Sequence, residues 1–509
     1  MLTTVYSIAL SGIEGYLVKV EVNMHQGMPN WEIVGLPGVS IREAKDRVRT
    51  AIRNSGFDIT SKNIVINLAP AYTRKEGSSF DLPIAIGILA DFHFIPMEEL
   101  KEYIFLGELS LDGKVNAVNG VLPMCIEAKK LGIKKIVVPY ENRIEAGMVQ
   151  GIEVYPAESL EELVKHLQGE KRICKFVTQE EEWLNINQNE VLDFADVKGQ
   201  ESAKRALEIA VAGGHNLLMV GSPGCGKTML AKRLPSIMPD LSFEEMMEIT
   251  KIHSVAGLLN IEKPIILQRP FRSPHHTITS TALVGGGQNP KPGEMSLAHL
   301  GVLFLDEFSE YKRSALESMR VPLEDRRVTV SRVNATYSYP CNFMLIASMN
   351  PCPCGNYGNP IKRCTCTPYQ RENYWKKLSG PLLDRIDIEI EMLPIEFEKM
   401  TSKEKCESSK VMKERVNMAR EVQRKRYENV GIYSNAEMTP AMITKFCSLS
   451  QEAQKMLQIS FEKLGLSARA YEKVMKVSRT IADIEGTKNV EVSHVAEAIQ
   501  YRALDRKMY

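Results

Sequence analysis

Short apolar runs alternate with amphipathic stretches over the first third of the chain. Residues 63–68 and 135–139 have the apolar, β-branched character of buried strands, and Gly and Pro residues punctuate the sequence between them. This pattern predicts a first α/β domain over residues 1–167. Residues 168–190 are polar, contain a run of three glutamates, and are predicted to form a linker.

A second alternating region carries stronger strand signals and predicts another α/β domain, over residues 191–395. Its expected strands are residues 216–220, 301–305 and 342–348. Strand signals then disappear, and residues 396–509 are predicted to form a helical C-terminal domain. Residues 400–427 read as a long charged helix, and residues 439–508 have apolar positions at helical spacing, such as Val474, Val477, Ile481 and Ile484.

The 509 residues include 64 Lys plus Arg and 63 Asp plus Glu, a net charge of +1. This balance excludes binding of nucleic acid through bulk positive charge, so any such contact must be local. No apolar run approaches the ~18 residues that a membrane span requires, and no signal-peptide pattern is present at the N-terminus. We therefore expect a cytoplasmic protein whose ten cysteines are reduced thiols or metal ligands.

A complete G-x-x-x-x-G-K-T loop follows the expected strand at residues 216–220. Its members are Gly221, Ser222, Pro223, Gly224, Cys225, Gly226, Lys227 and Thr228. Glycines let backbone N–H groups face phosphates, Lys227 reaches the β and γ oxygens, and Thr228 offers a hydroxyl to Mg²⁺. The alternative is a chance match, which the strand before the loop and the helix after it argue against.

Polar residues also end the next two expected strands. Asp306 and Glu307 follow residues 301–305; Asp306 would hold Mg²⁺ through water, and Glu307 would polarise the attacking water. Asn350, beyond residues 342–348, could hydrogen-bond the γ-phosphate and that water without adding negative charge. The alternatives are a solvated acidic turn and a turn asparagine preceding a proline. Together the motifs make ATP hydrolysis the leading chemistry.

Long segments of the chain resemble the ComM/YifB family, AAA+ ATPases of the magnesium-chelatase-like branch. The matching segments are residues 193–200, 271–276, 301–307, 348–355 and 379–387. The resemblance implies that Asn350 is sensor 1, Arg385 an arginine finger offered to a neighbouring subunit's ATP, and Arg469 the sensor 2 arginine. A finger supplied in trans makes hydrolysis depend on a ring, expected to be a homohexamer. The alternatives are a salt bridge of Arg385 with Asp384 or Asp387, and a solvated helix position for Arg469.

The first domain resembles the catalytic domain of Lon-type proteases, a ribosomal protein S5 domain 2-like α+β fold. The matching segments are residues 75–81, 106–113, 119–120 and 134–139. Ser79 falls near the position of the Lon catalytic serine, but Met124 stands where the catalytic lysine should be. A thioether cannot take the proton of a serine. The domain is therefore predicted to be proteolytically inactive and to serve assembly or substrate binding.

In this AAA+ branch two insertions line the pore of the ring. They correspond here to residues 277–298, a flexible and mildly basic loop, and to a hairpin over residues 326–339 that alternating valines indicate. Its arginines are the DNA-binding candidates: Arg326, Arg327 and, near the tip, Arg332. The alternative is a solvent-exposed hairpin whose arginines pair with Glu324 and Asp325. The basic cluster at residues 420–426 reads as a solvated helix face.

Four cysteines form two C-x-C pairs, Cys352 with Cys354 and Cys364 with Cys366. Residues two apart in extended backbone point to the same side, so four thiolates could close a tetrahedral structural zinc site. The spacing is tighter than in usual zinc knuckles, and metal-free thiols or disulfides are the alternatives. The adjacent histidines at 275 and 276 lack nearby metal ligands and receive no role.

The sequence thus predicts a Mg²⁺-dependent ATPase that assembles as a homohexamer and translocates on DNA. ComM-like branch migration of recombination intermediates, as in natural transformation, is the expected activity. The rival is the ATPase subunit of a metal chelatase, acting on a protein partner; such subunits lack a Lon-like first domain, so residues 1–165 argue against it. An ATP-dependent protease is the third alternative, weakened by Met124.

Overall fold

The structure is a computed structural model in which the chain forms two compact units. It describes residues 2–59, 62–177, 192–287, 290–332, 335–395, 406–428, 430–464 and 467–502. Unit 1 comprises residues 1–188 and 243–267, and unit 2 comprises residues 189–242 and 268–509. Residues 243–267 lie within the range predicted for the ATPase core, yet they pack as part of unit 1.

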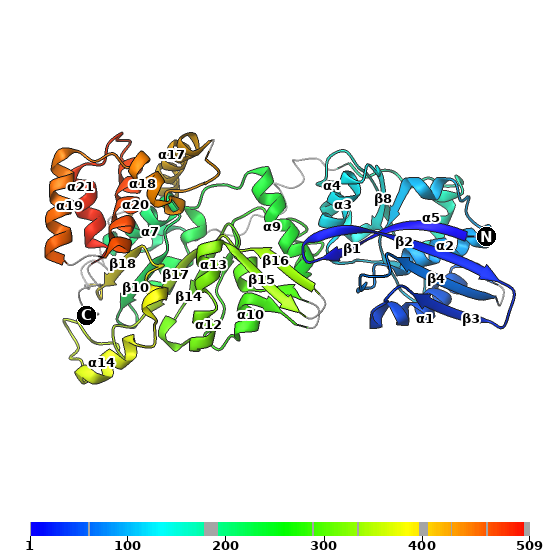
Figure 1. Ribbon diagram of the computed structural model, residues 1–509, viewed down its shortest axis with the longest axis horizontal. Coiled ribbons are helices and arrows are strands. Elements are labelled where there is room, and N and C mark those ends of the chain that lie inside the picture. The colour runs from blue at the N-terminus through cyan, green and yellow to red at the C-terminus, as the bar shows by residue number, and fades with distance from the viewer. Residues whose placement is uncertain are drawn as a thin grey trace. The chain divides into compact units, whose positions relative to one another are not determined.

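Unit 1 is built on a seven-stranded mixed sheet (Figure 1). In spatial order the strands are β3 (Asn30–Val34), β4 (Asn63–Ala69), β2 (Glu14–His25), β1 (Leu2–Ser11), β5 (Tyr103–Phe105), β8 (Lys135–Pro139) and β9 (Glu153–Ala157). β2 runs antiparallel to both of its neighbours, and the other adjacent pairs are parallel. β4 and β8 confirm the strands expected at residues 63–68 and 135–139.

The helices of unit 1 are α1 (Val39–Asn54), α2 (Asp81–Asp91), α3 (Val121–Lys130), α4 (Arg143–Gly147), α5 (Leu160–Leu167) and α9 (Phe243–Ala256). Every residue of α2 is buried, as expected for a helix that is apolar on all sides and packs against β1, β2 and α1. α9 packs on α3, where the Gly120 N–H donates to the Ser254 carbonyl at 3.2 Å. In the predicted linker, the Phe176 N–H donates to the Val154 carbonyl at 2.8 Å; residues 178–190 lie outside the described residues.

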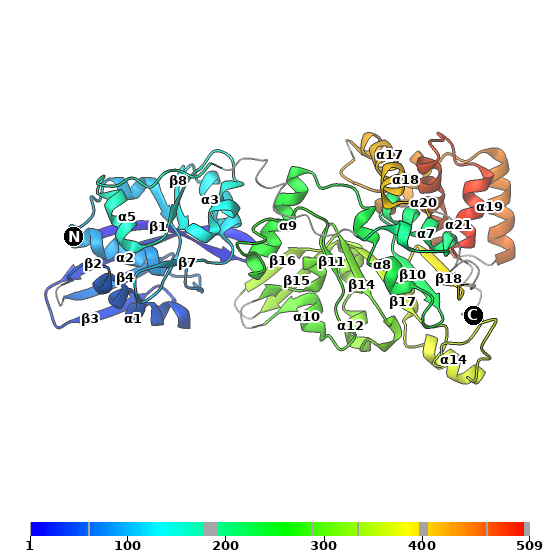
Figure 2. The ribbon, with the colours of Figure 1, turned by 180° about the vertical axis from the view of Figure 1, so that it is seen from behind.

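Unit 2 contains a five-stranded parallel sheet (Figure 2). Its strands in spatial order are β11 (Phe271–Arg272), β14 (Val302–Leu305), β17 (Met344–Met349), β10 (Leu217–Gly221) and β18 (Ile388–Met392). β10, β14 and β17 confirm the strands expected at residues 216–220, 301–305 and 342–348. Because adjacent parallel strands end at one edge of the sheet, the segments after these three strands meet there.

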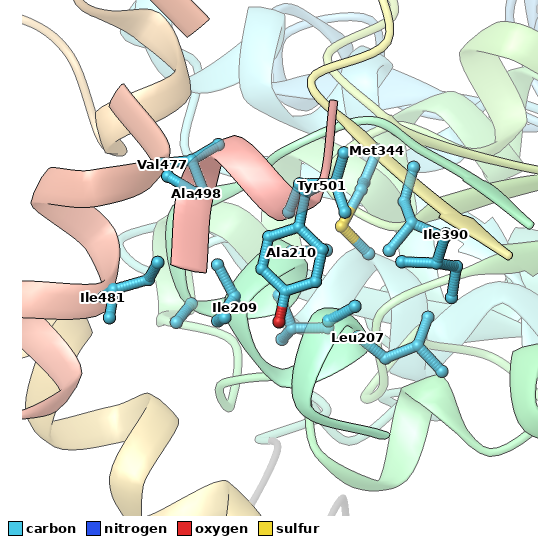
Figure 3. Packing of buried hydrophobic residues seen from close by; sticks show 14 of the residues in the cluster. Leu207, Ile209, Ala210, Met344, Ile390, Val477, Ile481, Ala498 and Tyr501 are labelled. Atoms are coloured by element: carbon cyan, nitrogen blue, oxygen red, sulfur yellow. The ribbon is translucent and has the colours of Figure 1, made fainter. Parts of the chain in front are cut away.

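The C-terminal part of unit 2 is helical, as predicted. Its helices are α17 (Ser409–Tyr427), α18 (Pro440–Phe446), α19 (Gln451–Leu464), α20 (Ala468–Ile484) and α21 (Val492–Gln500). Their apolar faces share one core with the sheet and with α7 (Glu201–Gly213): Figure 3 shows Val477 and Tyr501 beside Leu207, Met344 and Ile390. The fold class, α/β with a helical C-terminus, is confirmed. Among the described residues no helix combines the length and apolarity needed to cross a membrane.

Candidate functional site

The loop at residues 221–228 joins β10 to helix α8 (Lys227–Ala231). Gly224 and Gly226 have φ values of +81° and +96°, a backbone conformation that glycine adopts without steric cost. The Lys227 ammonium donates to the carbonyl oxygens of Gly221 at 2.6 Å and Ser222 at 3.1 Å, so it lies over the loop. Burial lowers its pKa. The loop therefore combines a cation with glycines in the left-handed conformation, the features from which phosphate-binding loops are built.

The predicted magnesium ligands lie next to each other at this edge. The Thr228 hydroxyl donates to one oxygen of Asp306 at 2.6 Å, and the Ser348 hydroxyl donates to the other. A hydroxyl and a carboxylate in contact fit Mg²⁺, which prefers oxygen ligands and keeps several waters. Asn350, after β17, accepts a hydrogen bond from Lys227 at 3.3 Å. Four sequence-predicted residues thus converge from three separate segments.

The position of Glu307 depends on its left-handed backbone conformation and on a contact with a histidine. Its φ is +54°, and its carboxylate is 57% exposed and lies 3.2 Å from Nδ1 of His276. Sequence reasoning gave His276 no role, because the contact joins segments that follow two adjacent strands, β11 and β14. Gln200 was also missed: with φ +60°, it donates to the carbonyls of Cys225 at 3.1 Å and Leu393 at 2.7 Å, bracing the phosphate loop.

These groups line a cavity of about 920 Å³ at the carboxyl edge of the unit 2 sheet. The cavity has the size of a small-molecule site. One wall holds Lys227, Thr228, Asp306, Glu307 and Asn350. The cavity is also lined by the cysteine segment and by α14 (Pro368–Trp375), which follows it: Cys354, Thr365, Cys366, Tyr369, Gln370, Asn373 and Tyr374.

The four cysteines singled out in the sequence come together. All four Sγ atoms lie within 4.8 Å of one another, and Cys352 lies 3.4 Å from Cys354 and 3.7 Å from Cys364. Four sulfurs about 2.3 Å from a zinc ion would be about 3.8 Å apart, so the spacing fits a tetrahedral site and is too long for disulfides. Backbone N–H groups, above all that of Asn356, donate hydrogen bonds to the Cys354 sulfur and lower the pKa of this thiol to about 5. Burial raises the pKa of the Cys352 thiol to about 12.

The two candidate arginines each have an acidic partner within unit 2. Arg385 forms an ion pair with Glu324, and donates to the Pro381 carbonyl at 3.1 Å; this pair replaces the expected alternatives Asp384 and Asp387. Arg469 lies 62% exposed, 2.6 Å from Asp384. Neither arginine lines the cavity of its own chain.

The predicted hairpin is present as β15 (Arg327–Arg332) and β16 (Ala335–Pro340), in antiparallel register. Val328 and Val330 face inward and are 1% and 6% exposed, which confirms the alternation. Asn334, near the tip, and the side chain of Arg332 lie outside the described residues. The Arg327 side chain is exposed.

The two expected pore segments lie side by side. In the first segment, a short hairpin of β12 (Gly285–Gly286) and β13 (Lys291–Pro292) lies between the helices α10 (Ser280–Val284) and α11 (Glu294–Leu297). The second segment contacts it, because the hydroxyl of Tyr339 in β16 donates to the Pro290 carbonyl at 2.7 Å. Arg326 pairs with Glu437 at 2.5 Å rather than with Glu324 or Asp325. In the 420–426 cluster, Arg426 is not solvated but forms an ion pair with the buried Asp483.

Unit 1 does not assemble a comparable site around Ser79. Ser79 is 6% exposed, in the turn before α2, and Met124, in α3, is 4% exposed. Lys75 is the lysine nearest to Ser79 in sequence, but its buried ammonium donates to the carbonyls of Gly35, at 3.1 Å, and Pro70. Among the described residues, no histidine, lysine or carboxylate hydrogen-bonds the Ser79 hydroxyl.

Comparison with protein families gives three matches along the chain. "Magnesium chelatase, subunit ChlI" matches residues 193–400, "Subunit ChlI of Mg-chelatase" matches residues 20–142, and "Magnesium chelatase, subunit ChlI C-terminal" matches residues 406–502. The first and third together cover unit 2 from just before the phosphate loop to the last helix.

Individual relatives match over the full length. The competence protein ComM of Haemophilus influenzae is 42% identical over 510 residues, 99% of this chain and 98% of that protein. YifB of Escherichia coli is 43% identical over the same shares of both chains. Lon protease 2 of Bacillus subtilis is 30% identical over 170 residues, 30% of each chain. The chain therefore belongs to the ComM/YifB family, in which a Lon-like N-terminal region precedes a magnesium-chelatase-type AAA+ ATPase with a helical C-terminus.

Proposed function

We propose that this protein is a Mg²⁺-dependent ATPase that moves along DNA and drives branch migration of recombination intermediates. The observation that carries the proposal is a phosphate loop, acidic pair and Asn350 around one cavity, in a chain that matches ComM over its full length. Membership of the AAA+ family itself indicates ATP hydrolysis. The DNA substrate and the movement are the proposed part.

Within the cavity each residue has a distinct task. Lys227 and the backbone of the loop would bind the phosphates, and Thr228 and Asp306 would hold Mg²⁺, which supplies charge neutralisation on the transferred phosphoryl group. Glu307 would take up a proton from the attacking water, whereas Asn350 would orient that water through its amide. The contacts among Lys227, Asn350, Thr228 and Asp306 support these roles, because the groups are already positioned near each other.

A homohexamer would complete the site. Arg385 is largely covered, and its guanidinium is engaged by a carboxylate that a neighbouring subunit's phosphates could replace. Arg469 has the same kind of exchangeable partner in Asp384 and would act as sensor 2. Both arginines would then respond to nucleotide at a subunit border.

DNA would contact the two adjacent hairpins. The Arg327 side chain is exposed on β15 and can meet a phosphate backbone. Arg332 is the last residue of the same strand, and we assign it the same kind of contact. Arg326 is engaged by Glu437 and would act mainly by fixing the base of the hairpin. A ring concentrates such arginines in one channel, which reconciles DNA binding with a net charge of +1.

The four-cysteine cluster would bind a structural Zn²⁺. The sulfur spacing supports a closed site with four protein ligands, and no position in it is left for a substrate.

The rival function is that of a metal-chelatase ATPase subunit, and the family matches favour it in name. Because "Subunit ChlI of Mg-chelatase" matches residues 20–142, the first region does not separate the two functions, contrary to the expectation from sequence. What favours the DNA motor is the full-length match to a competence protein.

ATP turnover with and without branched DNA tests the proposal. A DNA motor should hydrolyse ATP faster on branched DNA and should displace or migrate a labelled strand. Absence of both effects would contradict it. Nucleotide-dependent binding to a chelatase partner subunit, with no DNA binding, would establish the rival.

A further inference from the structure

The segment between Asn350 and α14 has almost no apolar core of its own. Residues 350–367 contain neither a helix nor a strand, and Ile361 and Tyr357 are 78% and 41% exposed. A stretch of this length with little buried apolar surface needs another source of order, and in small units a metal commonly supplies it. We call residues 352–366 the cysteine knob. Its four clustered sulfurs are the candidate metal ligands that would supply this order.

The cysteine knob packs directly against the phosphate loop. Gly355, with φ +76°, lies so close that a Cβ there would come within 2.6 Å of Pro223 and 3.9 Å of the Asn350 side chain. Cys354 and Cys366 line the same cavity as Lys227. The knob therefore forms one wall of the phosphate site.

The far end of the knob is anchored to the segment after the acidic pair. α14 begins at Pro368, two residues beyond Cys366, with a capping box between Thr367 and Gln370. From this helix, the Tyr374 hydroxyl accepts a hydrogen bond from Ser309 at 2.6 Å, and the Trp375 indole N–H donates to the Pro351 carbonyl at 3.2 Å. A change in the fold of the knob would thus move groups on both sides of the cavity.

We infer that zinc bound by the cysteine knob and nucleotide bound by the phosphate loop are thermodynamically coupled, each strengthening the binding of the other. This inference rests on the proposed nucleotide site of unit 2 but not on movement along DNA. Zinc binding would leave all four sulfurs as thiolates, release to solvent the protons that the thiols still carry, and give a centre with a net charge of about −2. Such a centre does not attract phosphates, so the coupling acts through the shape of the wall that touches Pro223 and Asn350.

Reciprocity gives a test on the unaltered protein. If zinc tightens nucleotide binding, nucleotide must tighten zinc binding by the same factor, typically at least about fivefold for coupled sites. Purified protein should contain one zinc per chain, and saturating ADP should raise the equilibrium affinity for zinc at least fivefold, measured by competition with a colorimetric chelator. Lys227→Ala, which should not bind ADP, controls for chelation of zinc by ADP itself and should show no such increase.

Two variants test whether the coupling acts through the metal and through the contact of the knob with Pro223. Cys364 belongs to the four-sulfur cluster but does not line the cavity. Cys364→Ser should therefore lose zinc, and it should weaken ADP binding about fivefold or more only through that loss. Gly355→Ala should keep zinc and still weaken ADP binding, because the added methyl group displaces the knob from Pro223. Cys406→Ser, a single thiol of unit 2 outside the cluster, should match the wild type in both.

Protein that contains no zinc, or ADP that leaves the equilibrium affinity of the wild type for zinc unchanged, would overturn the inference. Normal ADP affinity in Cys364→Ser chains that have lost zinc would also overturn it. These readouts use no DNA. A protein that passes them but moves no strand would therefore contradict the proposed function alone.

Discussion

Unit 1 and unit 2 both resemble catalytic domains, but within the described ranges reactive groups come together in unit 2 and not around Ser79 in unit 1. In unit 2 the ends of three parallel strands place Lys227, Thr228, Asp306 and Asn350 around one cavity. In unit 1, Ser79, expected near the position of the protease nucleophile, is 6% exposed, and Met124, expected at the position of the base, is 4% exposed.

The polar residues near Ser79 serve the fold instead. Asp81 accepts two hydrogen bonds from Arg47, at 2.8 and 3.0 Å, and another from the Leu109 N–H at 3.3 Å. Lys75 is likewise engaged by backbone carbonyls. The difference shows that likeness of fold does not carry chemistry, whereas convergence of side chains does.

Glu307→Gln should cause the largest loss of activity, because it removes the proposed base from unit 2 while keeping the shape of the side chain. We expect ATP turnover to fall by roughly 10²-fold or more, with nucleotide affinity within about twofold of the wild type. Phosphate release and fluorescent-ADP titration measure the two quantities. Glu310→Gln, a nearby glutamate paired with Lys377, is the matched control. Unchanged turnover in Glu307→Gln would remove this glutamate from the mechanism.

Arg385→Ala tests whether the ATP site of unit 2 is completed by a neighbouring subunit. Nucleotide binding by single chains should persist, but turnover in the ring should fall by roughly 10²-fold or more because the finger acts in trans. Mixing Arg385→Ala with Lys227→Ala chains should restore part of the turnover, since one variant supplies the site and the other the finger. Arg424→Ala, 78% exposed on α17, is the control. Without recovery in the mixture, action in trans is not supported.

Arg332→Ala should have a smaller effect, confined to DNA. Loss of the Arg332 phosphate contact should weaken DNA binding several-fold and reduce the slope of log affinity against log salt by about 1 for each copy in the ring that contacts DNA. Basal ATP turnover should stay at the wild-type value. Fluorescence anisotropy across a salt series provides the measurement. If neither affinity nor slope changes, the hairpin is not the DNA contact.

Ser79→Ala should have the smallest effect, because the described part of unit 1 places no base on that hydroxyl. Turnover of ATP and DNA binding should match the wild type, and neither protein should degrade casein with ATP. Casein cleavage by the wild type that Ser79→Ala abolishes would show that unit 1 is catalytic and would end the contrast between the units.

The sequence was sufficient where chemistry follows a contiguous pattern. The phosphate loop, the acidic pair and the C-x-C pairs are each read from neighbouring residues, and parallel strands then bring them to one edge. The valine alternation similarly located the hairpin. Local periodicity also predicted α20, whose Val474, Val477 and Ile481 are buried.

The sequence could not predict contacts between side chains that are far apart along the chain. Nothing in the local sequence of His276 indicates that it will face Glu307, and both Arg385 and Arg326 pair with acids other than those nearest in sequence. The packing of residues 243–267 with unit 1 depends on contacts such as the hydrogen bond from Ser254 to Glu145, more than 100 residues away. Such pairings depend on tertiary packing, which overrides local sequence signals.

Migration of a labelled four-way junction tests the central claim most directly. Wild-type protein with ATP and Mg²⁺ should convert the junction into its duplex products, and Glu307→Gln should bind the junction but leave it unmoved. A junction that stays intact while the wild type hydrolyses ATP, or one that Glu307→Gln resolves equally well, would contradict the account of this protein as an ATP-driven DNA motor.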